Sequence, residues 1–116
     1  RLGVQGIRHH TMGAHFRHRD EASLFEQWLD RAIEDCLGVD LLIYQAGADP
    51  HVNDPLGKVL TGVQMAKRDH AVFSAFQGRP LVWNLAGGYQ RDVNGGIEPV
   101  LKLHRTTAQI QNIYQP

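Results

Sequence analysis

Between Ser23 and Gly38, apolar residues recur at three- and four-residue steps. They are Phe25, Trp28, Leu29, Ala32, Ile33 and Cys36. The positions between them hold acidic, basic and amide side chains, so an α-helix would gather the apolar residues in one stripe. Asp20 or Ser23 is expected to cap the start, and Glu26 would complete a capping box with Ser23. Gly38 is expected to end the helix as its C′ residue.

Two apolar runs lack clean alternation of polar and apolar residues. They are Asp40–Ala46, DLLIYQA, and Pro80–Ala86, PLVWNLA. Runs of this kind suit strands that are covered on both faces, as in parallel sheets. A further candidate strand is Leu2–Ile7.

Two more helices are predicted, one on each side of the second strand. Thr61 is expected to cap a helix that stops at Gly78. The other helix should run from about Ile97 or Pro99 to Ile113, with Pro99 in its first turn. The expected inner residues are Val63, Ala66, Val72 or Phe73, Phe76, then Val100, Leu101, His104, Ala108 and Gln111. Because helices separate the strands, we predict right-handed parallel crossovers and a single domain with a three-layer α/β fold.

Such a small sheet leaves a long edge with unpaired backbone groups and exposed apolar side chains. Something should therefore cover that edge. We expect either another copy of the chain, giving a homo-oligomer, or a missing N-terminal half of the same parent protein.

Composition narrows the classes of protein. The chain has 116 residues, 42% of them hydrophobic, which is enough for one core. Twelve basic residues balance twelve acidic ones, so neither nucleic acid nor an anionic membrane is an expected partner. The single cysteine, Cys36, excludes an intrachain disulfide and suits a reducing compartment. With no membrane-spanning run or signal-peptide core in the sequence, we expect a cytoplasmic protein.

Each apolar run is followed by a loop that carries chemically active residues. The first loop, AGADPHVNDPLG, places Asp49 and Asp54 around His51, which are oxygen and nitrogen donors suited to Zn²⁺. The second, LAGGYQRD, presents Tyr89 after two glycines. Loops at the carboxyl ends of parallel strands converge on ligand sites. The alternative is that Asp49 and Asn53 only build Asx turns beside the prolines.

Several motifs follow one another in a telling order: GAD, DPLG, a Thr-initiated helix with Arg68 and Asp69, AGGY, and a helix containing LHRTT. In this order and spacing, the segment from Asp40 to Thr107 resembles the C-terminal part of the histone deacetylase superfamily. The resemblance is strongest to bacterial members related to acetoin-utilisation deacetylases and acetylpolyamine amidohydrolases. It implies a partial arginase/deacetylase-like fold, with two or three parallel strands and flanking helices.

The resemblance also implies roles for single residues. The aspartate of the GAD element is one of three zinc ligands in the family, which makes Asp49 the expected metal ligand. The tyrosine of GGY donates to the substrate carbonyl and its developing oxyanion, so Tyr89 is the expected catalytic residue. Gly87 and Gly88 would let the backbone bring the ring over the site. The aspartate of DPLG holds the loop, which is the role expected of Asp54.

Most of the family's active site has no counterpart here. The other two zinc ligands come from an upstream Asp-x-His element, and paired histidines activate the water. The one Asp-x-His here, Asp49-Pro50-His51, already belongs to the GAD loop. Asp49, even helped by His51, should not hold a catalytic zinc, since such sites use three protein ligands. Intact relatives hydrolyse N-acetyl amides of lysine or polyamine-like amines; this chain alone is expected to be inactive.

Other histidines and nucleophiles carry weaker hypotheses. The stretch RHHTMGAHFRHRD contains His9, His10, His15 and His18. The last two are spaced like metal ligands on one helical turn, but the neighbouring arginines would repel a cation. His104 is interpreted as a hydrogen-bonded core residue and His70 as a surface residue. Neither serine has a nucleophile-elbow context, and no P-loop or GxGxxG is present.

Three hypotheses therefore remain open. The chain is the C-terminal fragment of a zinc-dependent deacetylase, a non-catalytic module that assembles into homo-oligomers, or a metal hydrolase whose site is completed between subunits. In the last case His51 or the N-terminal histidines would supply the missing ligands.

Overall fold

The chain folds into a mixed α/β structure, described by a computed structural model over residues 6–14, 16 and 19–116. Its elements are short 3₁₀ helices at Met12–Ala14 and Arg19–Leu24, then α1 (Phe25–Cys36), β1 (Leu42–Gly47), α2 (Gly62–Ala75), β2 (Leu81–Ala86) and α3 (Glu98–Tyr114). The predicted order of three helices alternating with two strands is confirmed. The candidate strand Leu2–Ile7 lies largely outside the described residues.

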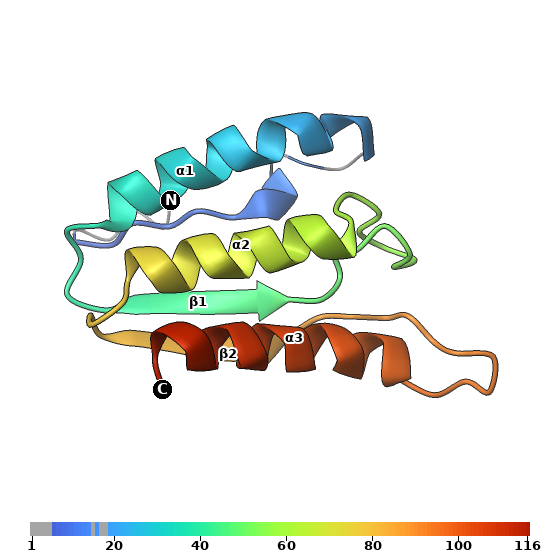
Figure 1. The fold of residues 1–116 in the computed structure, drawn as a ribbon. Coiled ribbons are helices and arrows are strands. Elements are labelled where there is room, and N and C mark those ends of the chain that lie inside the picture. The colour runs from blue at the N-terminus through green and yellow to red at the C-terminus, as the bar shows by residue number, and fades with distance from the viewer. Residues whose placement is uncertain (1–5, 15, 17–18) are drawn as a thin grey trace.

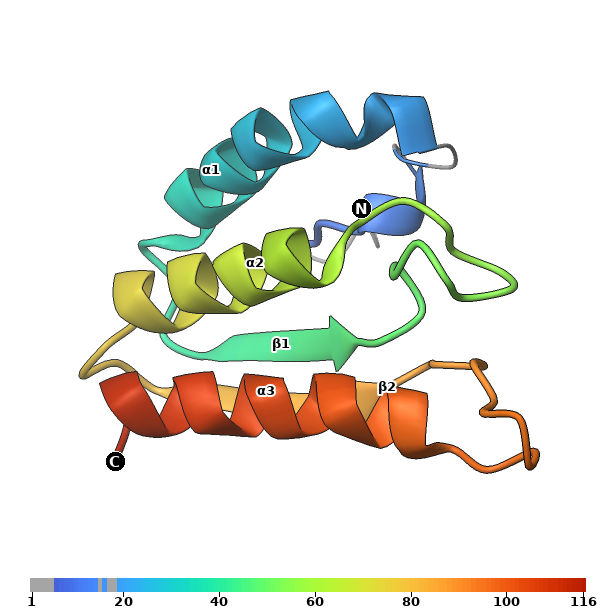
Figure 2. The same ribbon diagram turned by 45° about the vertical axis from the view of Figure 1, so that its right-hand side comes forward.

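β1 and β2 form a two-stranded parallel sheet in register from Leu42↔Leu81 to Gly47↔Ala86. The crossover between them is α2, which lies along β1, while α3 runs beside α2 and along β2 (Figure 1 and Figure 2). Both strands point toward the same end of the molecule. The loops that follow them therefore leave from one edge of the sheet, as a parallel sheet requires.

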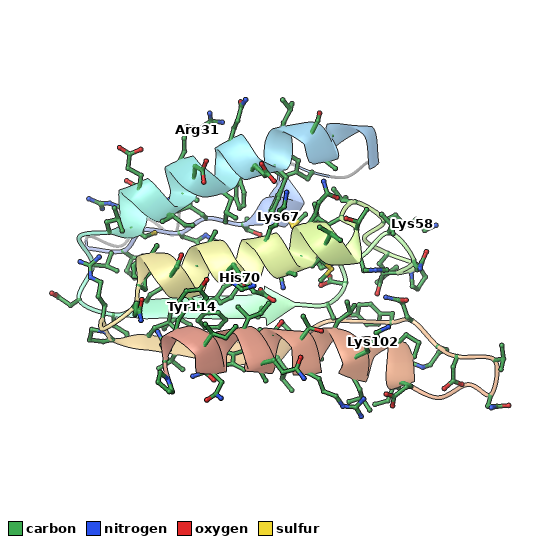
Figure 3. All side chains as sticks on the ribbon, in the orientation of Figure 1. Arg31, Lys58, Lys67, His70, Lys102 and Tyr114 are labelled. Carbon is green, nitrogen blue, oxygen red and sulfur yellow. The ribbon has the colours of Figure 1, made fainter. Side chains whose placement is uncertain are left out.

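The two helices cover one face of this sheet. Phe73 of α2 is fully buried and meets the rings of Tyr44 and Trp83 edge-on, with centroids 5.6 and 6.2 Å apart. At the far end of the helix pair, His70 of α2 and Tyr114 of α3 face each other (Figure 3), with 2.8 Å between Nδ1 and the hydroxyl oxygen. These contacts bind both helices and both strands into one layer pair.

The opposite face of the sheet is bare over the described residues. Ile43 and Val82 are neighbours in register on that face, and they are 70% and 56% exposed. Strands covered on both faces were predicted; the described residues cover one face, and a layer on the other face stays a prediction. An apolar strand sequence predicts that both faces of the strand are covered, but it does not identify the segment that covers each face.

The N-terminal part of the chain packs on the outer side of α2. Phe16, Phe25 and Trp28 form an aromatic cluster with ring centroids 5.6 to 5.8 Å apart. Beneath it lie the buried residues Leu60 and Met65. The apolar stripe of α1 is thus buried or half-buried as predicted, and it closes a core that is separate from the sheet face.

Local signals at the helix ends gave mixed results. Thr61 caps α2 in a capping box with Gln64, as its sequence position predicts. The predicted box at Ser23 is wrong, because the preceding residues wind as a 3₁₀ helix and Leu24 becomes the N-cap without a side-chain bond. Val63 and Ala108 were expected to face inward but are exposed.

Candidate functional site at the carboxyl edge of the sheet

The site predicted from the sequence lies where the loops after β1 and β2 meet. These loops, residues 48–61 and 87–97, leave the same edge of the sheet (Figure 1). The backbone N–H of Ala48 donates to the carbonyl of Ala86 at 2.9 Å, so pairing continues just past the strands. Side chains at the two loop starts are therefore held next to each other.

The loop after β1 is closed by its own backbone. The carbonyl of Pro50 accepts from the N–H groups of Val59 and Leu60 at 3.0 and 2.7 Å, and the N–H of Val52 donates to Leu60 at 2.7 Å. These bonds close the Pro- and Asp-rich segment into a compact loop. The loop after Asp49 is therefore held by a set of backbone hydrogen bonds and is more extensive than the two Asx turns of the alternative interpretation.

Asp54 joins the two loops. Its side chain is fully buried, and one carboxylate oxygen accepts from the backbone N–H of Leu56 and Gly57 at 2.8 and 3.3 Å. The other oxygen accepts from the N–H of Tyr89 at 2.8 Å. Charge-assisted bonds of this kind are stronger than neutral ones. Asp54 therefore holds the start of the tyrosine loop against the GAD loop.

Asp49 lies against the first glycine of the AGGY turn. A β-carbon at Gly87 would stand 2.5 Å from the Asp49 carboxylate oxygen, and Gly87 has a φ of +54°. Gly88 has a φ of +104°, and a β-carbon there would stand 2.7 Å from a methyl of Val100 on α3. Only glycine fits both the backbone conformation and the space at these positions. The turn that carries Tyr89 is thereby packed between the GAD loop and α3.

The reacting groups expected at Asp49 and Tyr89 remain accessible. Tyr89 is 47% exposed, although its backbone N–H is bound to Asp54. Asp49 is half-buried, and no described residue donates a hydrogen bond to its carboxylate. The structure thus brings the two loops together and leaves both side chains open to a partner.

His51 lies beside the start of α2, where a β-carbon at Gly62 would stand 3.8 Å from its Nε2. Its Nδ1 accepts from the N–H of Asn53 at 3.1 Å. Partial burial lowers the pKa of His51, and the nearby carboxylate of Asp54 offsets part of that shift. A neutral imidazole is the form that can bind a metal.

A cleft of about 550 Å³ runs between α2 and α3 above the end of β1. His51, Lys102 and His104 are among its lining residues, whereas Asp49 and Tyr89 are not. Partial burial lowers the pKa of His104, and a hydrogen bond to the backbone of Gly87 partly offsets it. His104 was interpreted as a hydrogen-bonded core histidine; it is half-buried, and its hydrogen bond connects it to the AGGY turn.

Sequence reasoning missed the buried polar network beneath this cleft. Arg68 and Asp69, adjacent on α2, are buried together with the hydroxyls of Tyr44 and Thr107. The available signal was an Arg-Asp pair at helical spacing between Met65 and Val72, on the inner side of α2.

No group of three histidine, cysteine or acidic side chains stands close enough to hold a metal ion within the part of the chain that the structure describes. His10 binds Asp35, with 2.8 Å between Nε2 and the carboxylate oxygen. The predicted ligand pair His15 and His18 lies outside the described residues. Across the described residues, no helix combines the length and apolar character needed to cross a membrane.

Comparison with known proteins finds a relative whose name states no function. The chain is 32% identical over 90 residues to an uncharacterized protein of Picosynechococcus sp.. The match covers 72% of this chain and 30% of that protein, so the chain spans about a third of its relative's length. No protein-family model matches the sequence, and no solved structure matches it.

Proposed function

We propose that the chain is the C-terminal part of a histone-deacetylase-like, zinc-dependent amide hydrolase with a three-layer α/β fold. In this proposal Asp49 supplies one zinc ligand and the Tyr89 hydroxyl donates a hydrogen bond to the carbonyl oxygen of an N-acetyl amine. The observation that carries it is the interlock of the two loops. Asp49 packs on Gly87, and Asp54 binds the backbone of Tyr89.

The chemistry of these residues suits the proposed roles. Asp49 has a carboxylate to which no described residue donates a hydrogen bond, so its oxygens are available to a zinc ion. Zinc, when bound, polarises the amide carbonyl. The phenol of Tyr89, fixed through its backbone, would donate where negative charge grows on that oxygen.

The chain alone should not catalyse this reaction. Catalytic zinc sites use three protein ligands, and Asp49 is one. The remaining ligands and the general base would come from a preceding segment. The relative's length supports this division, since most of that protein lies outside the match.

The cyanobacterial relative provides a test. We expect the purified relative to contain about one zinc per chain and to deacetylate a fluorogenic acetyl-lysine or acetylpolyamine substrate. Replacing its matching segment with this chain should preserve activity, and Asp49→Asn or Tyr89→Phe in the chimaera should abolish it. Asp92→Asn, in the same loop as Tyr89, is the control. A relative that neither binds zinc nor deacetylates would remove the proposal.

The bare sheet face favours a second candidate, an assembly module. Ile43 and Val82 form an exposed apolar pair, and such patches often mark interfaces. Sedimentation of the chain decides between them, because a strict monomer at tens of micromolar is not an assembly module. Metal analysis of protein prepared without chelators tests the remaining hypothesis of a zinc site shared between subunits.

A further inference from the structure

Arg68 and Asp69 form a charged pair inside the fold, 6% and 2% exposed. Arg68 Nε donates to Asp69 Oδ1 at 3.0 Å, and Nη2 lies 3.0 Å from the same oxygen in an ion pair. The Tyr44 hydroxyl donates to the same oxygen, and Thr107 donates to Oδ2 at 2.6 Å. Asp69 thus accepts hydrogen bonds from residues of β1, α2 and α3 inside the fold. These bonds hold its carboxylate in place, and the carboxylate in turn holds Arg68.

The remaining guanidinium nitrogen reaches the end of β1. Arg68 Nη1 donates to the carbonyl oxygen of Gly47 at 2.8 Å. A guanidinium is planar and rigid, so two nitrogens held by Asp69 also fix the direction of the third. The position of the Gly47 carbonyl is thereby set from α2.

One peptide group is thus bound on both sides. Its carbonyl, from Gly47, accepts from Arg68, and its N–H, from Ala48, donates to the Ala86 carbonyl of β2. The next residue is Asp49. Its carboxylate packs back onto this peptide, because a β-carbon at Gly47 would stand 2.8 Å from the Asp49 oxygen. A rotation of this peptide would move the carboxylate of Asp49 away from Gly87.

From this geometry we infer that Arg68 is a positioning residue for Asp49. Asp69 anchors it, and it acts through the Gly47–Ala48 peptide to aim the carboxylate of Asp49 at the AGGY turn. The functional meaning of that aim rests on the proposed role of Asp49 as a zinc ligand. The positioning itself is a property of the chain without metal.

The test uses the 116-residue chain in Arg68→Lys form, which keeps a cation beside Asp69 and loses the fork that reaches Gly47. Carbon-13 and amide NMR should show a shifted Asp49 carboxyl signal and shifted amides of Ala48 and Gly87. Amide exchange at Ala48 should accelerate about tenfold, whereas Ile110 in α3 should not change. Arg105→Lys, at an exposed arginine paired with Glu98, is the matched control and should leave all these signals in place.

A purely structural role predicts a different outcome. It would speed exchange at Ala48 and Ile110 alike and leave the Asp49 carboxyl signal of the folded form unmoved, which overturns the inference. If Arg68→Lys does not fold, Thr107→Val decides, because it loosens Asp69 without touching the guanidinium. We expect the same signals to shift by less, and no shift overturns the inference. Zinc takes no part in these measurements, so the outcome is independent of whether the proposed function fails.

Discussion

The two faces of the small sheet differ sharply in burial, although alternate residues of the same strands form them. Tyr44 points to the helices, meets Phe73 edge-on and donates to Asp69. Ile43, one position earlier, points to the bare face and is 70% exposed. The covered face is complete within this chain in packing and in hydrogen bonds, with no buried side-chain polar atom left unpaired among the described residues.

This difference shows which parts of the structure are held by contacts within the chain. The loops that carry Asp49 and Tyr89 are anchored from the covered side, through Arg68 and α3, and do not depend on the bare face. The loops should therefore keep their geometry whether or not a further layer covers the bare face. Substitutions on the two faces should separate these contributions.

The largest effect is expected from Phe73→Ala. Phe73 is fully buried and touches both strands, so its removal leaves a cavity at the centre of the covered face. Large-to-small changes of this kind cost roughly 3–5 kcal/mol of unfolding free energy. Urea unfolding followed by circular dichroism measures it. A loss no larger than that of Val82→Ala would mean that the two faces do not differ as described.

Tyr44→Phe tests the polar part of the covered face. It keeps the ring against Phe73 and removes one donor from the buried carboxylate of Asp69. Loss of a hydrogen bond to a buried charged group costs about 1–3 kcal/mol. Tyr114→Phe, which loses the bond to the half-buried His70, is the control and should cost less. Equal losses would count against a special role for the Asp69 network.

Acidification should lower the unfolding free energy through His51 and His104, which line the cleft on the covered side of the sheet. Burial lowers the pKa of both below the ordinary value of 6.5, so the unfolded chain binds more protons as the pH falls through 6.5. Their contribution is therefore present above about pH 6.5 and is lost below it. The melting temperature of the double variant with glutamine at both positions should fall less between pH 7.5 and 5 than that of the original chain. Gln109→Ala, at an exposed residue that does not titrate, should retain the original slope; identical slopes in all three proteins would contradict the prediction.

The smallest stability effect is expected on the bare face. Ile43→Thr keeps a β-branched residue in the strand and removes exposed apolar surface, so the unfolding free energy should change by no more than about 0.5 kcal/mol. Binding of a hydrophobic dye and self-association in sedimentation should decrease. Lys67→Thr, on the exposed side of α2, controls for a general change in surface polarity. A large loss of stability would show that the face is already covered in solution.

The sequence was most informative where a signal was local and periodic. The stripe of α1 and the Thr61 cap of α2 follow from side-chain spacing and short-range hydrogen bonding, and both are confirmed. The parallel sheet followed from apolar runs separated by helices. The three-layer arrangement stays a proposal, because the same apolar run is compatible with a covered and an uncovered face.

The candidate site was predictable in part for the same reason. Asp49 and Tyr89 stood out as a carboxylate and a phenol in glycine-rich loops directly after strands. The part played by Arg68 depends on the carbonyl of Gly47, twenty-one residues earlier in the chain. No pattern in one sequence specifies which backbone atom a buried arginine will reach, since that depends on how α2 is seated on β1.

The loop after β2 reaches well beyond the first turn of α3 (Figure 2) before it returns to enter that helix. At its far tip Val93 is fully exposed, and the turn is closed locally, with Asp92 accepting from the N–H of Asn94 and Gly96 at 2.9 and 2.8 Å. Extra residues or a chemical label at this tip would hang in solvent without straining the neighbouring turn. Homologous chains can therefore vary in length here with little loss of stability. A fluorophore attached at position 93 would report on the loop that carries Tyr89 without blocking the site.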